Sequence, residues 1–313
     1  MKIIFMGTPD YAVATLNSLM EAGADVSLVV TQPDREKGRG RGITETPVKT
    51  CAEKWGIPVF QPSRIRNPEA IMRLREEKPD LMIVAAFGQI LSQEILDIPP
   101  KGCVNVHASL LPKYRGAAPI QRAVLDGVSK SGVTIMQMDA GIDTGDILFQ
   151  ESVTLTPGET GQSLYDKLAA LGGKLLVEHL GDIESGNFIP VKQIDEESSY
   201  AKMLNKDMGA VNWNASAVCI ERLIRGMNPW PGAYTRFRNK TLKLWAAEVV
   251  PEKTGRTPGT VLGADRDRIY VATGDGMLAL TDIQLEGKKR MNVREFLLGC
   301  QISAGEIMES GKK

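Results

Sequence analysis

The sequence predicts a doubly wound α/β domain with a mostly parallel sheet, followed by a small β-barrel. Over residues 1–150, short continuously apolar segments alternate with helix-like segments, which is typical of a parallel sheet covered on both faces. After residue 226 come five short strand-like segments with Gly and Pro turns, which indicate a small antiparallel barrel. The length of 313 residues also suits two domains, at roughly 150 residues each.

The strands expected in the α/β part are short runs of apolar and β-branched residues. Their apolar residues are continuous rather than alternating, which indicates burial on both faces of the sheet. These strands are Lys2–Met6, Val26–Thr31, Val59–Gln61, Leu81–Ala86, Gly102–His107 and Gly132–Met138.

Segments with helical spacing lie between and after these strands. Tyr11–Ala22 ends before Gly23, a residue that commonly follows a helix. Thr46–Trp55 carries Pro47 in its first turn, where proline is favoured. The other expected helices are Pro68–Glu77, Pro119–Gly127 and Ser163–Leu180, the last of which contains Gly172 and Gly173.

Four loops after strands carry unusual residues: Gly7–Asp10, Phe87–Leu91, Ala108–Gly116 and Asp139–Asp146. Ligands of open α/β sheets gather at the carboxyl ends of the strands, so these loops are the expected binding region. The first loop is not a G-x-G-x-x-G motif, and Pro9 removes a backbone donor that a phosphate would need. A tight strand-to-helix turn is therefore expected there, rather than a dinucleotide site.

The second part begins after a polar stretch, residues 186–200, which is interpreted as a linker. A helix is expected over Asn214–Gly226. The strands expected after it are Tyr234–Phe237, Leu242–Val250, Gly259–Ala264, Arg268–Thr273 and Leu278–Ile283.

The formal net charge is zero, with 38 Lys and Arg against 38 Asp and Glu, which excludes a generally basic nucleic-acid-binding coat. The charges are uneven, because residues 1–205 hold 21 basic against 26 acidic residues and residues 206–313 hold 17 against 12. The excess in the second part is compatible with a surface that binds a polyanion and equally with ordinary scatter of charge.

The four cysteines, Cys51, Cys103, Cys219 and Cys300, form no C-x-x-C pair and suggest neither a disulfide framework nor a metal site. Buried, reduced thiols in a cytosolic protein are the simplest interpretation. The N-terminal apolar run is too short for a signal peptide, and no stretch reaches the roughly 18 apolar residues of a membrane span. We therefore expect a cytoplasmic protein that does not bind membranes.

Asn105 and His107 form the first candidate catalytic pair, because side chains two residues apart on a strand point to the same face. An amide donates to a developing oxyanion, and an imidazole gives or takes a proton near neutral pH. Asp143, in the sequence GIDTGD, is expected to hold the imidazole tautomer and favour its protonated form. Taken alone, a histidine at a strand end is more often structural than catalytic.

Longer motifs surround these residues. Val104–Ile120 reads VNVHASLLPKYRGAAPI, and Asp143 lies 36 positions after His107. On these segments the chain resembles the folate-dependent formyltransferases, and the resemblance extends over nearly its whole length. It is strongest to the members that act on methionyl-tRNA. Further matching segments are Met6–Ala12, Thr31–Gly40, Thr134–Leu148, Tyr165–Gly172, Asn228–Tyr234 and Val271–Gly276.

The resemblance implies transfer of a formyl group from the co-substrate 10-formyltetrahydrofolate to the α-amine of methionine on initiator tRNA, with no metal. It places Asn105, His107 and Asp143 at the catalytic positions. Asn105 and a protonated His107 would stabilise the oxyanion that forms when the amine attacks the formyl carbon. His107, or a water held by Asp143, would move the proton from the amine to N10 of the folate.

A folate site needs a flat apolar slot with a few backbone donors. The resemblance implies one wall at Phe87, Gly88, Gln89, Ile90 and Leu91 and another at Ser109, Leu110, Leu111 and Pro112, with Asp139 and Ile142 closing the pterin pocket. Without the resemblance, ordinary packing at the edge of the core is the preferred interpretation of these stretches.

The loop Arg35–Gly42 (REKGRGRG) alternates basic residues with glycines. Arginine makes bidentate contacts with phosphates, although a solvated surface loop is the plain alternative. The resemblance implies that Lys37, Arg39 and Arg41 contact the acceptor end of the tRNA. It also implies that the barrel supports the tRNA, where Arg236, Arg238, Lys240, Lys243, Lys288, Lys289 and Arg290 supply positive charge.

These inferences give a Rossmann-like formyltransferase catalytic domain at residues 1–189, a linker at 190–206 and an OB-like tRNA-binding domain at 207–313. The expected partners are initiator methionyl-tRNA and the folate co-substrate, without DNA, and a monomer is the expected state.

Three other functions remain open at this point. One is a formyltransferase of the same fold that acts on a sugar-nucleotide amine or a ribonucleotide, which the basic loop and the barrel disfavour. Another is a hydrolase that releases formate with the same three residues and needs no tRNA-binding loop. The third is a non-catalytic RNA-binding protein, which the joint presence of Asn105, His107 and Asp143 disfavours.

Overall fold

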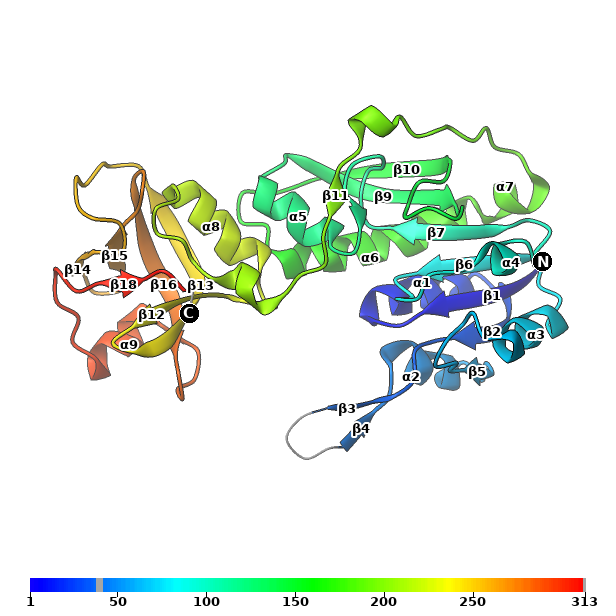
Figure 1. Cartoon of the computed structure of the whole chain (residues 1–313), viewed down its shortest axis with the longest axis horizontal. Helices are drawn as coiled ribbons and strands as arrows, with labels where there is room; N and C mark the ends of the chain where they lie inside the picture. The colour runs from blue at the N-terminus through cyan, green and yellow to red at the C-terminus, as the bar shows by residue number, and fades with distance from the viewer. Residues whose placement is uncertain (38–41, 312–313) are drawn as a thin grey trace. The chain divides into compact units, whose positions relative to one another are not determined.

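The computed structural model describes residues 1–37 and 42–311, and its chain forms two compact units (Figure 1). The first unit comprises residues 1–119, 130–154 and 165–201. The second comprises residues 120–129, 155–164 and 202–313, so it also takes two short segments from the earlier part of the chain. The predicted order, an α/β part and then a β part, is confirmed.

A seven-stranded sheet forms the centre of the first unit, in the order β10-β9-β7-β6-β1-β2-β5. The strands are β1 (Lys2–Gly7), β2 (Asp25–Val30), β5 (Val59–Phe60), β6 (Leu81–Ala85), β7 (Cys103–His107), β9 (Lys130–Gln137) and β10 (Ile147–Thr154). Five of them run parallel, whereas β9 is antiparallel to β7 and β10 is antiparallel to β9. The mostly parallel sheet and its six predicted strands are confirmed, and β10 is an addition.

Helices cover both faces of this sheet. They are α1 (Asp10–Glu21), α2 (Pro47–Lys54), α3 (Pro68–Glu76), α4 (Gln93–Leu96), α6 (Gly161–Glu178), of which the first four residues belong to the second unit, and α7 (Leu180–Ser185). On one face, Met6 and Cys103 pack with Leu74 of α3 and Ile95 of α4 in a continuous apolar core. Cys103 belongs to this core and shares a face of β7 with Asn105 and His107, because side chains two and four residues apart on a strand point the same way.

A glycine pair sets the approach of α6 on the opposite face. A Cβ on Gly172 would lie 2.8 Å from Cγ1 of Val106, and a Cβ on Gly173 would lie 3.0 Å from the carbonyl oxygen of Ala14 in α1. The glycines inside this predicted helix therefore allow α6 to pack closely on both β7 and α1.

The basic loop starts from a hairpin of β3 (Arg35–Lys37) and β4 (Gly42–Thr44). Asp34, just before it, accepts hydrogen bonds from Lys49 at 2.7 Å and from Gln61 at 2.7 Å. These two hydrogen bonds hold the pKa of Asp34 below its usual value, and the one from Lys49 has the larger effect. The base of the hairpin is thus fixed by an ion pair with Lys49 of α2 and by a hydrogen bond from Gln61, the residue after β5.

The second unit contains a seven-stranded antiparallel sheet in the order β14-β15-β16-β13-β12-β18, with β17 beside β16. Its strands are β12 (Ala233–Phe237), β13 (Lys240–Val250), β14 (Val261–Ala264), β15 (Ile269–Ala272), β16 (Met277–Leu285), β17 (Met291–Asn292) and β18 (Met308–Glu309). An antiparallel bridge between Thr260 and Ile307 joins the two ends of the sheet, so it curls into a barrel. All five predicted strands are present, and β17 and β18 are additions.

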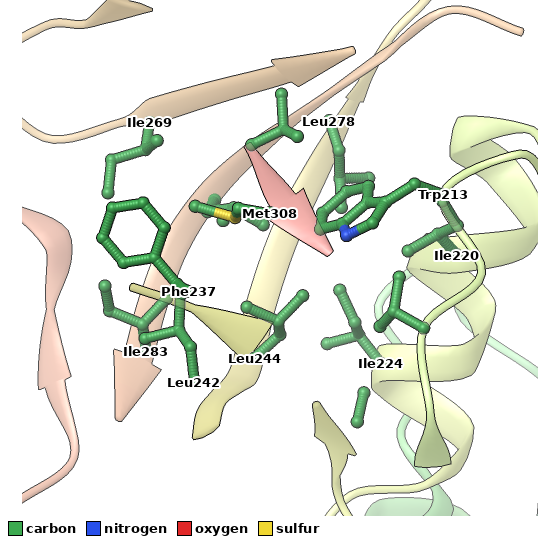
Figure 2. Packing of buried hydrophobic residues seen from close by; sticks show 14 of the residues in the cluster. Trp213, Ile220, Ile224, Phe237, Leu242, Leu244, Ile269, Leu278, Ile283 and Met308 are labelled. Carbon is green, nitrogen blue, oxygen red and sulfur yellow. The ribbon is translucent and has the colours of Figure 1, made fainter. Parts of the chain in front are cut away.

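Three helices belong wholly or almost wholly to this unit. They are α5 (Pro119–Asp126), α8 (Ala217–Gly226) and α9 (Val293–Gly299). Figure 2 shows the barrel core, where Ile220 and Ile224 of α8 face the buried side chains of the strands. Trp213, which precedes α8, has the largest buried side chain of this core, and its indole N–H donates to Oγ1 of Thr235 at 3.0 Å.

None of the helices within residues 1–37 and 42–311 combines the length and the apolarity needed to cross a bilayer.

The four cysteines are unpaired, but only Cys51 and Cys103 are buried, whereas Cys300 is partly exposed and Cys219 is exposed. The expectation of four buried thiols is therefore half correct. Burial raises the pKa of the Cys103 thiol to about 12 and also raises the pKa of Cys51.

We expect iodoacetamide at about pH 8 to alkylate Cys219 rapidly in the native protein and to leave Cys103 unmodified, because only the thiolate reacts. Peptide mass spectrometry over a time course measures both rates, and denatured protein, in which all four thiols should react, is the control. Equal rates at Cys103 and Cys219 in the native protein would contradict this assignment of burial.

Candidate active site

Strand β7 places Asn105 and His107 on one face near its carboxyl end. The strand lies between β6 and β9, where Asn105 is paired with Val84 on one side and Met136 on the other. Both side chains are largely buried, with exposed fractions of 9% for Asn105 and 6% for His107. The two polar groups therefore sit in a mostly dry environment, in which electrostatic interactions are strong.

The loop that carries Asp143 starts at a different edge of the sheet from the one expected. Because β9 is antiparallel to β7, this loop starts at the amino end of β7, where the N–H of Met138 donates to the carbonyl of Cys103 at 2.8 Å. It does not begin at the edge where the other three loops gather. It then turns back, and a Cβ on Gly145 would lie 1.8 Å from the carbonyl oxygen of Gln137, so the turn requires glycine.

The three predicted catalytic residues meet at this turn. Nδ2 of Asn105 donates to Oδ1 of Asp143 at 3.3 Å. Nδ1 of His107 lies 3.7 Å from Oδ2 of Asp143, which is an ion-pair distance but too long for a hydrogen bond. Asp143 itself has a positive φ of 54°, a left-handed conformation that few residues other than Gly, Asn and Asp adopt readily.

The imidazole of His107 is oriented by a backbone group. Its Nε2 lies 3.0 Å from the carbonyl oxygen of Tyr114, which can only accept a hydrogen bond, so Nε2 carries a proton. Nδ1 is then the nitrogen that faces Asp143 and can gain or lose a proton. The carbonyl of Tyr114 therefore sets the tautomer that was expected to depend on Asp143.

Backbone and side-chain donors hold Asp143. The N–H of Gly116 donates to its Oδ2 at 2.8 Å. The side chain of Gln193 donates to its carbonyl oxygen at 2.9 Å. Sequence reasoning missed Gln193, because it lies 50 positions further along in the polar stretch interpreted as a linker.

The first predicted folate wall is formed mainly by backbone. The side chains of Phe87 and Leu91 are buried in the core under β6. Gln89 is engaged with the backbone, since its Oε1 accepts from Ile65 at 2.7 Å and its Nε2 donates to Pro62 at 3.2 Å. The exposed groups are Gly88 and the side chain of Ile90.

The second predicted wall is a fixed turn directly after His107. Oγ of Ser109 donates to the carbonyl of Lys113 at 2.6 Å, and the N–H of Leu111 donates to Oγ1 of Thr134 at 3.1 Å. Ser109 and Leu111 are buried, so Leu110 and Pro112 are the more accessible members of this wall.

Asp139 and Ile142 lie on the exposed side of the Asp143 loop. Asp139 accepts hydrogen bonds from the N–H of Gly141 at 3.0 Å and from the hydroxyl of Thr144 at 2.7 Å. These bonds shape the loop, while the side chain of Ile142 is 51% exposed.

A hollow of about 370 Å³ adjoins the first wall. Two exposed arginines, Arg64 and Arg66, border it, and Nε of Arg66 donates to the carbonyl of Ile90 at 2.8 Å. No sequence motif marks these arginines, since two isolated basic residues in a loop carry no pattern. The lining residues are Arg64, Ile65, Arg66, Asn67, Gln89 and Ile90.

Of the predicted tRNA contacts, Arg39 and Arg41 lie outside the described residues, and only the backbone of Lys37 is described. Within residues 1–37 and 42–311, no three His, Cys, Asp or Glu side chains are grouped closely enough to bind a metal ion.

The sequence matches two protein-family models along the chain. Residues 1–180 match the formyl transferase model, and residues 203–301 match the model of the formyl transferase C-terminal domain. A methionyl-tRNA formyltransferase of Agathobacter rectalis is 52% identical over 98% of this chain and 99% of its own length. One from Geobacter metallireducens is 48% identical over 97% of each chain.

Solved structures share the fold at low sequence identity. A sugar 3N-formyl transferase solved in the presence of dTDP and 5-N-formyl-THF has a TM-score of 0.66 at 20% identity, over 92% of this chain and 99% of that one. An N-formyltransferase of Helicobacter canadensis, in complex with folinic acid and dTDP-3-aminofucose, has a TM-score of 0.65 at 19% identity, over 93% and 100%. The family models, which cover both parts of the sequence, and the full-length relatives show that the chain belongs to the formyl transferase family.

Proposed function

We propose that this protein transfers the formyl group of 10-formyltetrahydrofolate to the α-amine of methionine on initiator tRNA, giving N-formylmethionyl-tRNA for translation initiation. The observation that carries the proposal is the meeting of Asn105, His107 and Asp143 at one buried strand end. Full-length relatives named methionyl-tRNA formyltransferase support the acceptor. Two structures with this fold, one solved in the presence of 5-N-formyl-THF and one in complex with folinic acid, support the donor.

Asn105 is suited to stabilise negative charge on the formyl oxygen. Its amide nitrogen carries two hydrogens, and the contact with Asp143 uses one of them. The other can point at an oxygen in the site. Because Asn105 is nearly buried and already oriented by Asp143, its amide dipole is fixed before the reaction, which is the condition for effective oxyanion stabilisation.

His107 is suited to hold a positive charge and to move a proton. With Nε2 donating to Tyr114, a second proton on Nδ1 would face the carboxylate of Asp143 across 3.7 Å. The carboxylate would stabilise the imidazolium. The positive charge of the imidazolium would in turn stabilise the oxyanion. Nδ1 would then give its proton to the leaving nitrogen as the bond from the formyl carbon to N10 breaks, and would take a proton from the attacking amine in return; alternatively, a water held by Asp143 would carry the proton between the two nitrogens.

The direct test is to incubate the purified protein with 10-formyltetrahydrofolate and charged initiator methionyl-tRNA. We expect formyl-methionyl-tRNA to form, as measured by release and chromatography of the aminoacyl group. Formate release without formylated tRNA would instead identify a hydrolase, and formylation of an amino sugar nucleotide in place of tRNA would identify the sugar-directed function.

A cytoplasmic location is part of the proposal. The substrates proposed for this protein belong to the translation machinery, and the protein's four unpaired cysteines are compatible with a reducing compartment.

Arg64 and Arg66 are expected to bind the carboxylates of the folate glutamate tail, because they border the hollow beside Gln89 and Ile90. We predict that Arg64→Ala raises KM for 10-formyltetrahydrofolate roughly fivefold and leaves kcat nearly unchanged. Steady-state kinetics at saturating tRNA measure both constants. Arg75→Ala, which removes an exposed arginine from α3, is the control, and an equal rise in KM there would argue against a local role.

The basic loop is expected to bind the tRNA backbone. We predict that Arg39→Ala combined with Arg41→Ala raises KM for tRNA and flattens its dependence on salt, because fewer counterions are released on binding. KM measured over a series of KCl concentrations gives the slope. Lys54→Ala combined with Arg75→Ala removes the same charge elsewhere, and a salt slope equal to wild type in the loop variant would refute this role.

A further inference from the structure

Residues 193–201, here called the site strap, contact the elements that surround His107 and Asp143. The strap contains the 3₁₀ turn η1 (Asp195–Glu197) and ends in β11 (Tyr200–Ala201), and its sequence is polar. β11 pairs in parallel with β8 (Arg115–Gly116), and the N–H of Gly116 donates to Asp143. All these residues belong to the first unit.

The side chain of Gln193 joins two loops of the site. Its Nε2 donates to the carbonyl oxygens of Asp143 at 2.9 Å and of Gly145 at 2.7 Å. Its Oε1 accepts from Nε of Arg115 at 2.9 Å. Both amide hydrogens and the amide oxygen are therefore used, and the Asp143 loop is tied to the turn after His107.

Other groups of the strap hold the partner of His107. Oγ of Ser199 accepts from the N–H of Tyr114 at 2.9 Å, and the carbonyl of Ser199 accepts from the N–H of Arg115 at 2.8 Å. The buried guanidinium of Arg115 also pairs with Asp195 at 2.9 Å. Tyr114, whose carbonyl orients the imidazole, has a positive φ of 62°, so its conformation needs such support.

We infer that the site strap is part of the catalytic machinery and that Gln193 is a positioning residue for Asp143. The inference rests on the proposed function for its kinetic consequences. Asp143 lies in the left-handed region, and the carbonyls of residues 143 and 145 are the groups that Gln193 holds. Without those bonds the loop can relax and move the carboxylate away from Asn105 and His107. A displacement of about 1 Å can cost up to roughly 10²-fold in rate.

Two variants of Gln193 separate its contacts. Gln193→Met keeps the size and removes every hydrogen bond. Gln193→Glu keeps an acceptor for Arg115 but places a carboxylate against the two carbonyls. We expect each to lower kcat roughly 10- to 100-fold, with KM for both substrates within about twofold of wild type. Lys192→Met, on the exposed neighbouring residue, should retain wild-type kcat.

A double-mutant cycle tests whether Gln193 acts through Asp143. In an Asp143→Asn background, Gln193→Met should cost less than about twofold, because the positioned carboxylate is already absent. The same loss as in the wild-type background would overturn the inference and leave Gln193 with a merely structural role. Wild-type kcat for both Gln193 variants would overturn it as well.

Hydrogen exchange without substrates distinguishes this inference from the proposed function. Amides of residues 139–146 should exchange faster in Gln193→Met than in wild type, while those of β1 should not change. Faster exchange supports the strap even if the wild-type protein formylates some other amine. Unchanged exchange in the loop would overturn the positioning role whatever the substrate is.

Discussion

His107→Ala and Asn105→Ala should each lower kcat for formyl transfer by about 10²–10³ while the protein remains folded. The expected size follows from the loss of one preorganised donor or charge at a nearly buried position. Substrate KM should change much less, because the interaction is made in the transition state rather than in the bound substrate. Initial rates at saturating folate and tRNA measure the effect directly.

The chain offers a matched control in its other histidine. His179 stacks on Phe149 with ring centroids 3.8 Å apart and bonds Asp182 at 2.9 Å, far along the chain from the catalytic strand. His179→Ala should therefore lower stability without a comparable loss of kcat. Wild-type turnover in folded His107→Ala, shown to be folded by circular dichroism, would remove His107 from the mechanism.

Trp213→Ala should destabilise the barrel by about 3–5 kcal/mol, the usual cost of deleting a large aromatic side chain from a core. Trp213 is 1% exposed and packs against Ile220, Ile224 and Met308 (Figure 2). Its removal would also leave Thr235 without its indole donor, although Oγ1 of Thr235 still donates to the carbonyl of Glu309. Urea unfolding followed by far-ultraviolet circular dichroism measures the change in free energy.

Two further variants calibrate that result. Trp213→Phe keeps most of the apolar contact and loses the hydrogen bond, so it should cost less than Trp213→Ala. Trp230→Ala, at a side chain that is 53% exposed, should cost less than about 1 kcal/mol. If Trp213→Ala unfolds at the wild-type midpoint, the indole does not anchor the barrel core.

The strands that sequence reasoning located are those with continuous apolar runs or clear turn signals. β10 was not predicted because its residues are polar at most alternate positions, as suits an edge strand that faces solvent on one side. β17 and β18 are two residues long, too short for any periodicity to register. The pairing that closes the barrel involves residues that share no local pattern.

The placement of Asn105 and His107 on one face of β7 was predictable because strand alternation alone sets it, whereas their expected catalytic role came from the surrounding motif. Asp143 was found through its loop motif, but its path into the site depends on the antiparallel direction of β9, which no local signal sets. The burial of Phe87 and Leu91 was not predictable, because apolar residues after a strand look the same in a sequence whether they line a ligand site or fill the core.

Tyr114 and Gln193 were missed for a common reason. Tyr114 acts through a backbone carbonyl, which every residue type possesses, so its identity gives no signal. Gln193 acts across 50 positions on carbonyls of another loop, and a glutamine in a polar segment is unremarkable by itself. Such contacts with backbone groups follow from the tertiary fold rather than from any motif.

The place of residues 193–201 in the chain also bears on when the active site is completed during synthesis. Asn105, His107 and Asp143 leave the ribosome well before Gln193 and Ser199, although these later residues hold the loop of Asp143 and the turn of Tyr114. A nascent chain, or a fragment cut at residue 189, would carry all three reactive side chains without their supports. The active site would then become complete only after the sheet has formed, when the final segment of the first unit packs against it.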